Sequence, residues 1–229
     1  MKKFFILIIL IPFLSFPQSK DPRIILDNVK KTFSKIKDYE VSVDIKLDVS
    51  FLKVPETHAT IYYKQPDKIY IASKDFALLP KGALDFSPAG FMKGNYTALF
   101  DREEIYDGTK TVVIKTIPLG ESSDIVLTTF WIDPSKNIIR KVEVSTKVNG
   151  TFTIELKYDA NSGYVQLPSS LVFKFNISKL NIPKRFTNQD ESEQSKNYSK
   201  KSATGTVYIV YSNYKVNRGL PDSLFNTKK

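Results

Sequence analysis

The clearest pattern in the sequence is an alternation of apolar and polar residues over positions 39–51. The apolar members are Tyr39, Val41, Val43, Ile45, Leu47, Val49 and Phe51. Because successive strand residues point to opposite faces, this segment predicts a strand with one apolar face and one polar face. At about 3.3 Å per residue it would extend about 43 Å, which is long for a strand and favours a large, curved sheet.

An amphipathic helix is predicted just before this strand. Asp21 is a suitable helix cap, and Pro22 suits the first helical position. Apolar residues then recur at helical spacing at Ile25, Val29, Phe33 and Ile36. The pattern predicts a helix of about four turns that ends near Asp38.

Shorter alternating stretches predict the rest of the sheet. They cover residues 59–63, 69–71, 98–106, 111–117, 125–132, 138–148, 152–158, 171–177 and 206–216. The pairs Asp107-Gly108 and Asn149-Gly150 are strong signals for tight hairpin turns. Consecutive strands joined by such turns predict an antiparallel meander rather than alternating strands and helices.

Two segments lack a regular pattern. Residues 181–203 are rich in Lys, Ser, Asn, Gln and Glu, so they predict a mobile loop or a loosely formed hairpin. Residues 74–95 are apolar but interrupted by Pro and Gly, which predicts a lid over an apolar surface, a short pair of helices that closes the core, or both. The candidate lid residues, two of them from the predicted N-terminal helix, are Phe33, Ile36, Phe76, Leu78, Leu79, Phe86, Phe91 and Met92.

A sheet with one apolar face has to bury that face, and the predicted helices are too few to cover it. We therefore expect a mainly β (α+β) fold: an unclosed antiparallel half-barrel with an N-terminal helix and a helical or irregular lid, forming a single domain over residues 20–229. The expected lining of its apolar cavity is Val41, Val43, Ile45, Leu47, Ile61, Tyr63, Ile69, Ile71, Trp131, Val142, Val144, Ile154, Leu156 and Phe173. For Trp131, a place in the ordinary core is the alternative.

The first 19 residues have the form of a secretory signal. Lys2 and Lys3 are followed by an apolar run over residues 4–14 that is too short to span a bilayer, and then by polar residues. Cleavage near Gln18 or Ser19 is expected, and a retained N-terminal anchor is the alternative. The chain has no cysteine, which excludes disulfides, thiolate metal sites and a lipid-modified N-terminal cysteine.

Charge and candidate chemistry argue for binding rather than catalysis. The formal charge is +10, which suits either attraction to anionic lipid headgroups or solubility alone. His58 is the only histidine, and adjacent Glu103 and Glu104 face opposite ways on a strand, so no catalytic or metal-binding set is evident. We expect no enzyme activity, no cofactor and, without a basic helix or a nucleic-acid motif, no nucleic-acid partner.

Several stretches resemble the periplasmic lipoprotein-carrier (LolA-like, lipoprotein-sorting) family. They are the helix followed by a long strand, residues 63–69, 131–134, 167–169 and 212–217, and the hairpin through Asn149-Gly150. The resemblance implies a periplasmic monomer that carries the acyl chains of lipoproteins, or other lipids, toward the outer membrane between transient membrane-associated donor and acceptor proteins. Burying an acyl chain of about 16 carbons is worth roughly 12 kcal/mol before ordering costs, so no catalytic group is needed to hold it.

The sequence departs from the family at one position. Carriers of this family commonly have an Arg shortly after the proline of the 63–69 motif, where it holds the lid shut. Tyr70 lies near that place here, and no Arg is present. The lid then works differently or the ligand is not a lipoprotein. The alternative function is an envelope sensor in which a lipid-binding half-barrel regulates a partner protein.

Overall fold

A computed structural model describes residues 21–49, 52–53, 55–73, 88–92, 94–120, 123–148, 150–159, 164, 166–177 and 203–226. The expected signal peptide, residues 181–202 of the expected polar loop and the lid candidates Phe76, Leu78, Leu79 and Phe86 lie outside these described residues.

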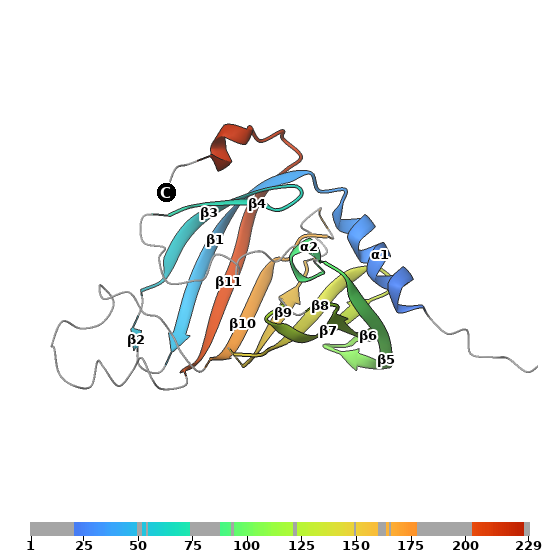
Figure 1. The fold of residues 1–229 in the computed structure, drawn as a ribbon. Coiled ribbons are helices and arrows are strands. Elements are labelled where there is room, and N and C mark those ends of the chain that lie inside the picture. Colours follow the sequence, from blue (N-terminus) through green and yellow to red (C-terminus); the bar gives the residue numbers. More distant parts are fainter. Residues whose placement is uncertain are drawn as a thin grey trace, which may run out of the picture.

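The described residues form one antiparallel sheet that curves into a half-barrel (Figure 1). Its strands are β1 Asp38–Val49, β2 Leu52–Lys53, β3 Thr57–Lys64, β4 Lys68–Ala72, β5 Tyr96–Tyr106, β6 Thr109–Pro118, β7 Ile125–Asp133, β8 Ile138–Thr146, β9 Thr151–Lys157, β10 Ser170–Ile177 and β11 Ala203–Val216. The order is β4-β3-β1-β11-β10-β9-β8-β7-β6-β5, with β2 paired to β1 alone. Among the described residues β4 and β5 are the edge strands, so the barrel is not closed, and the expected half-barrel fold is confirmed.

The sheet consists of a meander, β5 to β11, whose last strand pairs with the first strand of the domain, β1. Strands β5 to β11 pair in sequence order, and β11 then pairs with β1, which pairs with β3 on its other side. In the β1–β11 ladder Leu47 lies opposite Val207. The long first strand therefore lies inside the sheet and ties the two ends of the domain together.

The register places one apolar row across the concave face. The row runs through Leu47, Val207, Phe173, Ile154, Val142, Phe130 and Ile114. Along β1, the residues that alternate with the inward-facing ones are polar. They include Asp44 and Lys46, which are exposed on the convex face. The alternation seen in the sequence is thus the division of the sheet into an apolar inner face and a polar outer face.

The helix α1, Pro22–Phe33, begins where the sequence predicts and ends earlier. Asp21 caps it by accepting a hydrogen bond from Arg23 N at 2.9 Å. Beyond Phe33, side chains from distant strands take the carbonyl groups that a longer helix would use. Gln65 Nε2 donates to Ser34 O and Ile36 O, and Asn217 Nδ2 donates to Lys35 O at 3.0 Å. The prediction of a helix reaching Asp38 is wrong because these tertiary partners compete with the helical pattern.

Two short helices complete the described part of the chain: α2, Pro88–Phe91, and the 3₁₀ helix η4, Asp222–Phe225. The helix α1 contacts β5, β8 and α2, so it lies across the opening of the half-barrel (Figure 1). No helix among the described residues is long and apolar enough to cross a membrane.

Candidate functional site

The concave face brings most of the expected cavity residues together. Eight of them belong to one continuous buried cluster: Val41, Val43, Ile45, Ile61, Val142, Val144, Ile154 and Leu156. Four more pack against this cluster and are partly buried: Leu47, Ile69, Ile71 and Phe173. Of the expected lid residues, Met92 joins the same cluster and Phe91 packs against it. The inner surface of the sheet is therefore a single apolar wall with α2 on it.

Trp131 does not belong to this wall. Its neighbours Phe130 and Ile132 face the buried cluster, so Trp131 points to the convex side. There its indole N–H donates to Glu104, and the Lys141 ammonium lies 4.2 Å from the ring centroid. The prediction that Trp131 lines the cavity is wrong, because a strand places adjacent residues on opposite faces.

Three other expected site residues form a corner between α1 and the first strands. The Tyr63 ring stacks on Tyr39 with centroids 5.0 Å apart and meets Phe33 edge-on at 5.7 Å. Ile36 packs against Leu167 in a second, smaller apolar cluster. Phe33 and Ile36 therefore anchor the end of α1, and their expected role in a lid stays a prediction.

Hydrogen bonds hold the same corner. The buried Asp38 carboxylate accepts from the backbone N–H of Arg218 at 2.8 Å and of Gly219 at 3.0 Å. Asn217 accepts from Lys37 N at 2.7 Å. Gln65 and Asn217 both come from stretches that carried the resemblance to the carrier family, so these stretches build the fold.

Tyr70 lies near the position where carriers of the family have an Arg. Its ring stacks on Tyr62 with centroids 5.9 Å apart.

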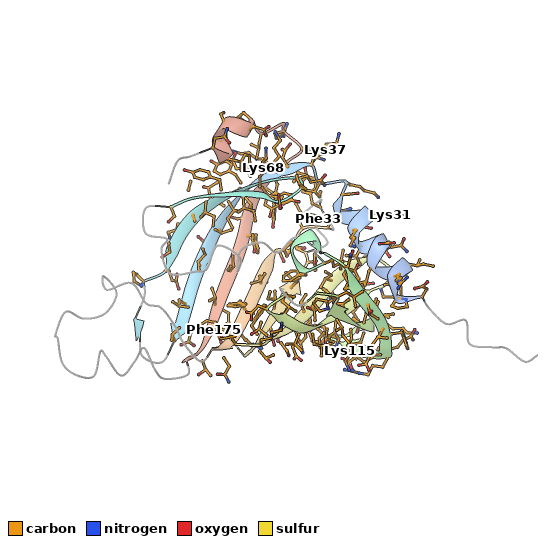
Figure 2. All side chains as sticks on the ribbon, in the orientation of Figure 1. Lys31, Phe33, Lys37, Lys68, Lys115 and Phe175 are labelled. Carbon is orange, nitrogen blue, oxygen red and sulfur yellow. The ribbon has the colours of Figure 1, made fainter. Side chains whose placement is uncertain are left out.

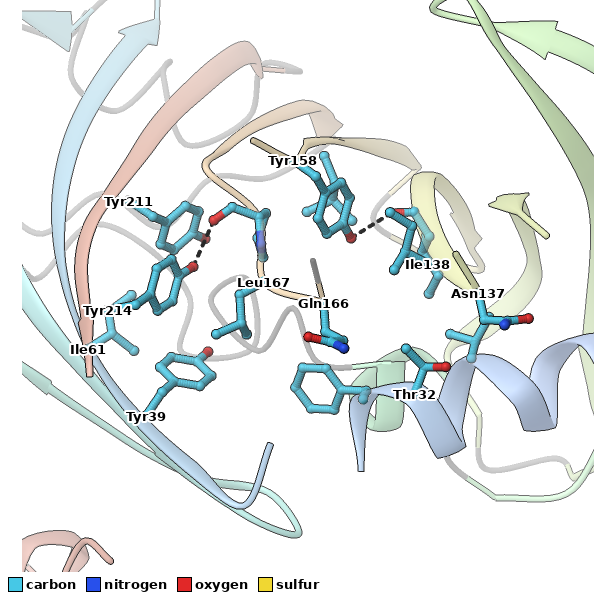
Figure 3. A pocket seen from close by; sticks show the side chains of 15 residues that line it. Thr32, Tyr39, Ile61, Asn137, Ile138, Tyr158, Gln166, Leu167, Tyr211 and Tyr214 are labelled. Atoms are coloured by element: carbon cyan, nitrogen blue, oxygen red, sulfur yellow. Dashed lines mark hydrogen bonds between the residues drawn. The ribbon is translucent and has the colours of Figure 1, made fainter. Parts of the chain in front are cut away.

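A small cavity of about 30 Å³ lies between this corner and strands β8 to β11 (Figure 3). Tyr211 and Tyr214 both enter it because Asn213, with φ of 56°, forms a bulge that turns both rings to the concave side. The Tyr214 hydroxyl donates to Pro168 O at 2.8 Å. The Tyr211 hydroxyl is buried and has no hydrogen-bond partner among the described residues. The space is about that of one water molecule, so it cannot hold a lipid tail.

Burial keeps the tyrosine hydroxyl groups of this wall uncharged. It raises the pKa of Tyr158, Tyr211 and Tyr214, because the phenolate form would lose its hydration. On the convex side, burial is the main cause that raises the pKa of Tyr106 to about 12. The phenols of Tyr158, Tyr211 and Tyr214 are neutral at physiological pH, and the inner wall they form suits an uncharged part of a ligand.

A larger pocket of about 350 Å³, partly open to solvent, lies beneath α2 at the β5 end of the sheet. Its lining is Gly90, Phe91, Gly94, Asn95, Tyr96, Thr116, Pro118, Leu119, Gly120, Ser123, Ile125 and Thr128. Ligand pockets typically measure about 300–1,000 Å³. We call it the α2 pocket.

Of the expected site residues, Phe91 is the one that lines the α2 pocket. Sequence reasoning missed Thr116 and Thr128 because it looked for apolar side chains. The two threonines lie opposite each other in the β6–β7 ladder and are buried. A pair of polar residues at inward-facing positions is the signal that could have marked the pocket.

Lys30 places a positive charge beside the α2 pocket. Its Nζ donates to the Tyr96 hydroxyl at 2.9 Å and lies 5.2 Å from the centroid of the same ring. Among the described residues, no group of three or more His, Cys, Asp or Glu side chains could hold a metal ion. Within the described ranges, the site therefore offers apolar walls, a few hydroxyl groups and the Lys30 cation bonded to Tyr96 of its lining.

Comparison with known proteins identifies the fold. No family model matches the sequence, and no curated protein matches it. Among solved structures, the chain is similar to a LolA superfamily protein from Nitrosomonas europaea, with 14% identity and a TM-score of 0.54 over 90% of this chain and 97% of that one. It is also similar to a DUF1329 family protein from Desulfovibrio piger, with 11% identity and a TM-score of 0.57 over 90% and 98% of the two chains. The chain has a LolA-like open half-barrel fold.

Proposed function

We propose that this protein is a periplasmic lipid carrier that holds acyl chains in the α2 pocket. The observation that supports the proposal is a pocket of about 350 Å³ on the apolar face of an unclosed half-barrel. The family resemblance adds the direction of transport: acyl chains of lipoproteins or other lipids move toward the outer membrane. Transient donor and acceptor proteins at the two membranes would load and unload a monomeric carrier, with no catalytic step and no cofactor.

The size of the pocket sets a scale for the affinity. At about 30 Å³ per methylene-sized group, 350 Å³ holds about a dozen such groups. Burying a dozen methylenes is worth roughly 10 kcal/mol at about 0.8 kcal/mol each. Association itself costs on the order of 4–15 kcal/mol. The balance allows binding that is reversible, as a carrier requires.

An alternative function is a sensor that regulates a partner protein. It is favoured by the free edge of β5, where Leu99, Phe100 and Ile105 are exposed. A sheet edge with exposed apolar side chains can pair with an added strand of another chain. Such a module would co-purify with a membrane partner and would contain no lipid.

The proposal is tested with a fluorescent fatty-acid analogue and a matched pair of variants. Leu119 lines the α2 pocket and is 62% exposed, whereas Val148 is 66% exposed and lines neither of the two pockets described here. Both residues tolerate a charge without unfolding because they are exposed. Leu119→Glu should weaken binding because it puts a carboxylate against the tail, and Val148→Glu should leave binding unchanged.

Two results would count against a carrier. The first is a native protein that binds no analogue and carries no lipid in native mass spectrometry. The second is equal affinity of the Leu119→Glu and Val148→Glu variants, which would move the binding site away from the α2 pocket.

A further inference from the structure

We infer that the α2 pocket takes a single-chain lipid with an anionic headgroup and that Lys30 holds this headgroup at the edge of the pocket. The inference rests on the proposed function and names the class of lipid. It is carried by the position of Lys30 relative to Tyr96 and by the size of the pocket.

The first step is the geometry of Lys30. It comes from α1, which lies against β5 and α2, the elements that form one side of the α2 pocket. Its ammonium group is bound to the hydroxyl of Tyr96, a residue of the pocket lining, at 2.9 Å. A phenol hydroxyl and a ring face orient the cation without neutralising its charge.

The second step is the charge around Lys30. Asp27, one turn earlier on α1, has its carboxylate oxygen 4.0 Å from Lys30 Nζ, and the two side chains are 60% and 38% exposed. An exposed pair at this separation is weak and screened by salt. The cation therefore keeps most of its attraction for an anion that arrives at the edge of the pocket.

The third step is the size of the pocket. About a dozen methylene-sized groups fit into 350 Å³, which corresponds to most of one acyl chain. The hydroxyl groups of Thr116 and Thr128 and the side chains of Asn95 and Ser123 suit the polar end of a lipid better than a second tail. A lipid with one tail and a compact negative head matches both the volume and the charge.

The experiment compares three probes: oleate, methyl oleate and 1-oleoyl-lysophosphatidylglycerol. Oleate and methyl oleate share a tail and differ in charge, and the lysophospholipid replaces the carboxylate with a phosphodiester. Calorimetry measures the binding of each probe at low and at high salt. The protein used is the chain without the expected signal peptide, residues 1–19. The wild-type protein should bind the anionic probes about five- to tenfold more tightly than methyl oleate, and high salt should reduce this preference.

The variants separate the charge of Lys30 from its packing. Lys30→Met should remove the preference for anionic probes and leave the affinity for methyl oleate unchanged, whereas Lys30→Arg should retain the preference. Lys31, the next residue on α1, is exposed and lines neither described pocket, so Lys31→Met is the matched control (Figure 2). The anionic probe whose affinity falls further in Lys30→Met identifies the headgroup as a carboxylate or a phosphate.

Each remaining outcome is decisive. Equal binding of oleate and methyl oleate to the wild-type protein, or an unchanged preference in Lys30→Met, overturns the headgroup site and leaves the carrier proposal standing. If none of the three probes binds, the carrier proposal itself fails.

Discussion

Tyr211 and Tyr214 differ in the hydrogen bonding of their hydroxyl groups, and mutation can test this difference. The Tyr211 ring is buried in the wall of the half-barrel, the Tyr214 ring is partly buried, and the two rings stack with centroids 6.0 Å apart. The Tyr214 hydroxyl donates to Pro168 O, whereas the Tyr211 hydroxyl has no partner in the part of the chain that the structure describes. Replacing each tyrosine by phenylalanine removes one oxygen atom and preserves the ring. The two variants should change the free energy of unfolding in opposite directions.

The magnitudes follow from the hydrogen bonds. A buried polar group without a partner costs about 1–3 kcal/mol, so Tyr211→Phe should stabilise the protein by about 1–2 kcal/mol. Tyr214→Phe removes a hydrogen bond and leaves the Pro168 carbonyl unpaired, so it should destabilise the protein by about 1–3 kcal/mol. For a domain of this size, each kcal/mol shifts the melting temperature by about 2–4 °C.

The assay is urea unfolding followed by circular dichroism, with thermal melting as a second measure. Tyr208 on the same strand is 41% exposed, and Tyr208→Phe is the control, expected to change stability by less than about 0.5 kcal/mol. If Tyr211→Phe loses stability, the argument is refuted. The hydroxyl would then have a partner in the folded protein, such as a water molecule in the adjoining 30 Å³ cavity.

Two further predictions concern the sheet. A Cβ at Gly205 would lie 2.6 Å from Phe175 Cζ, so Gly205→Ala should cost about 1–3 kcal/mol in chemical denaturation, and the loss should shrink in a Phe175→Leu background (Figure 2). Hydrogen bonds from Arg102 and Trp131 lower the pKa of Glu104, so the stabilisation it gives is present above the unfolded pKa of about 4.3 and is lost as the pH falls through the lower folded value. The fluorescence of Trp131, the single Trp of the chain, should report this transition, and Glu104→Gln should abolish it.

The inward and outward faces of a strand could be predicted where apolar and polar residues alternate regularly, and not where apolar residues are consecutive. Strand β1 alternates without interruption from Tyr39 to Val49, so both its existence and its faces were predictable. Strand β7 contains the consecutive apolar residues Phe130, Trp131 and Ile132, and such a run carries no information about which face each residue takes. The error over Trp131 arose there, and only the ladder to β6 and β8 decides it.

The end of α1 and the α2 pocket were missed for a different reason. The helix stops at Phe33, and side chains of Gln65 and Asn217, 29 to 182 positions away, donate to the carbonyl groups of the three residues that follow it. The pocket includes the buried Thr116–Thr128 pair, which a search for apolar positions passes over. Both features depend on contacts between distant segments, which a local pattern does not contain.

The segment that follows α1 is fixed by hydrogen bonds, whereas the β5 side of the half-barrel contains the α2 pocket. The segment between α1 and β1 is bound on one side by Gln65 and on the other by Asn217, and Asp38 ties the start of β1 to the backbone after β11. Moving this corner would break several hydrogen bonds at once. Toward the β5 edge, Lys30 in the last turn of α1 donates a hydrogen bond to Tyr96, which lines the α2 pocket, and this pocket is partly open to solvent. Under the proposed function, we therefore expect a lipid to enter the α2 pocket on the β5 side, near the Lys30 ammonium, and not at the hydrogen-bonded corner.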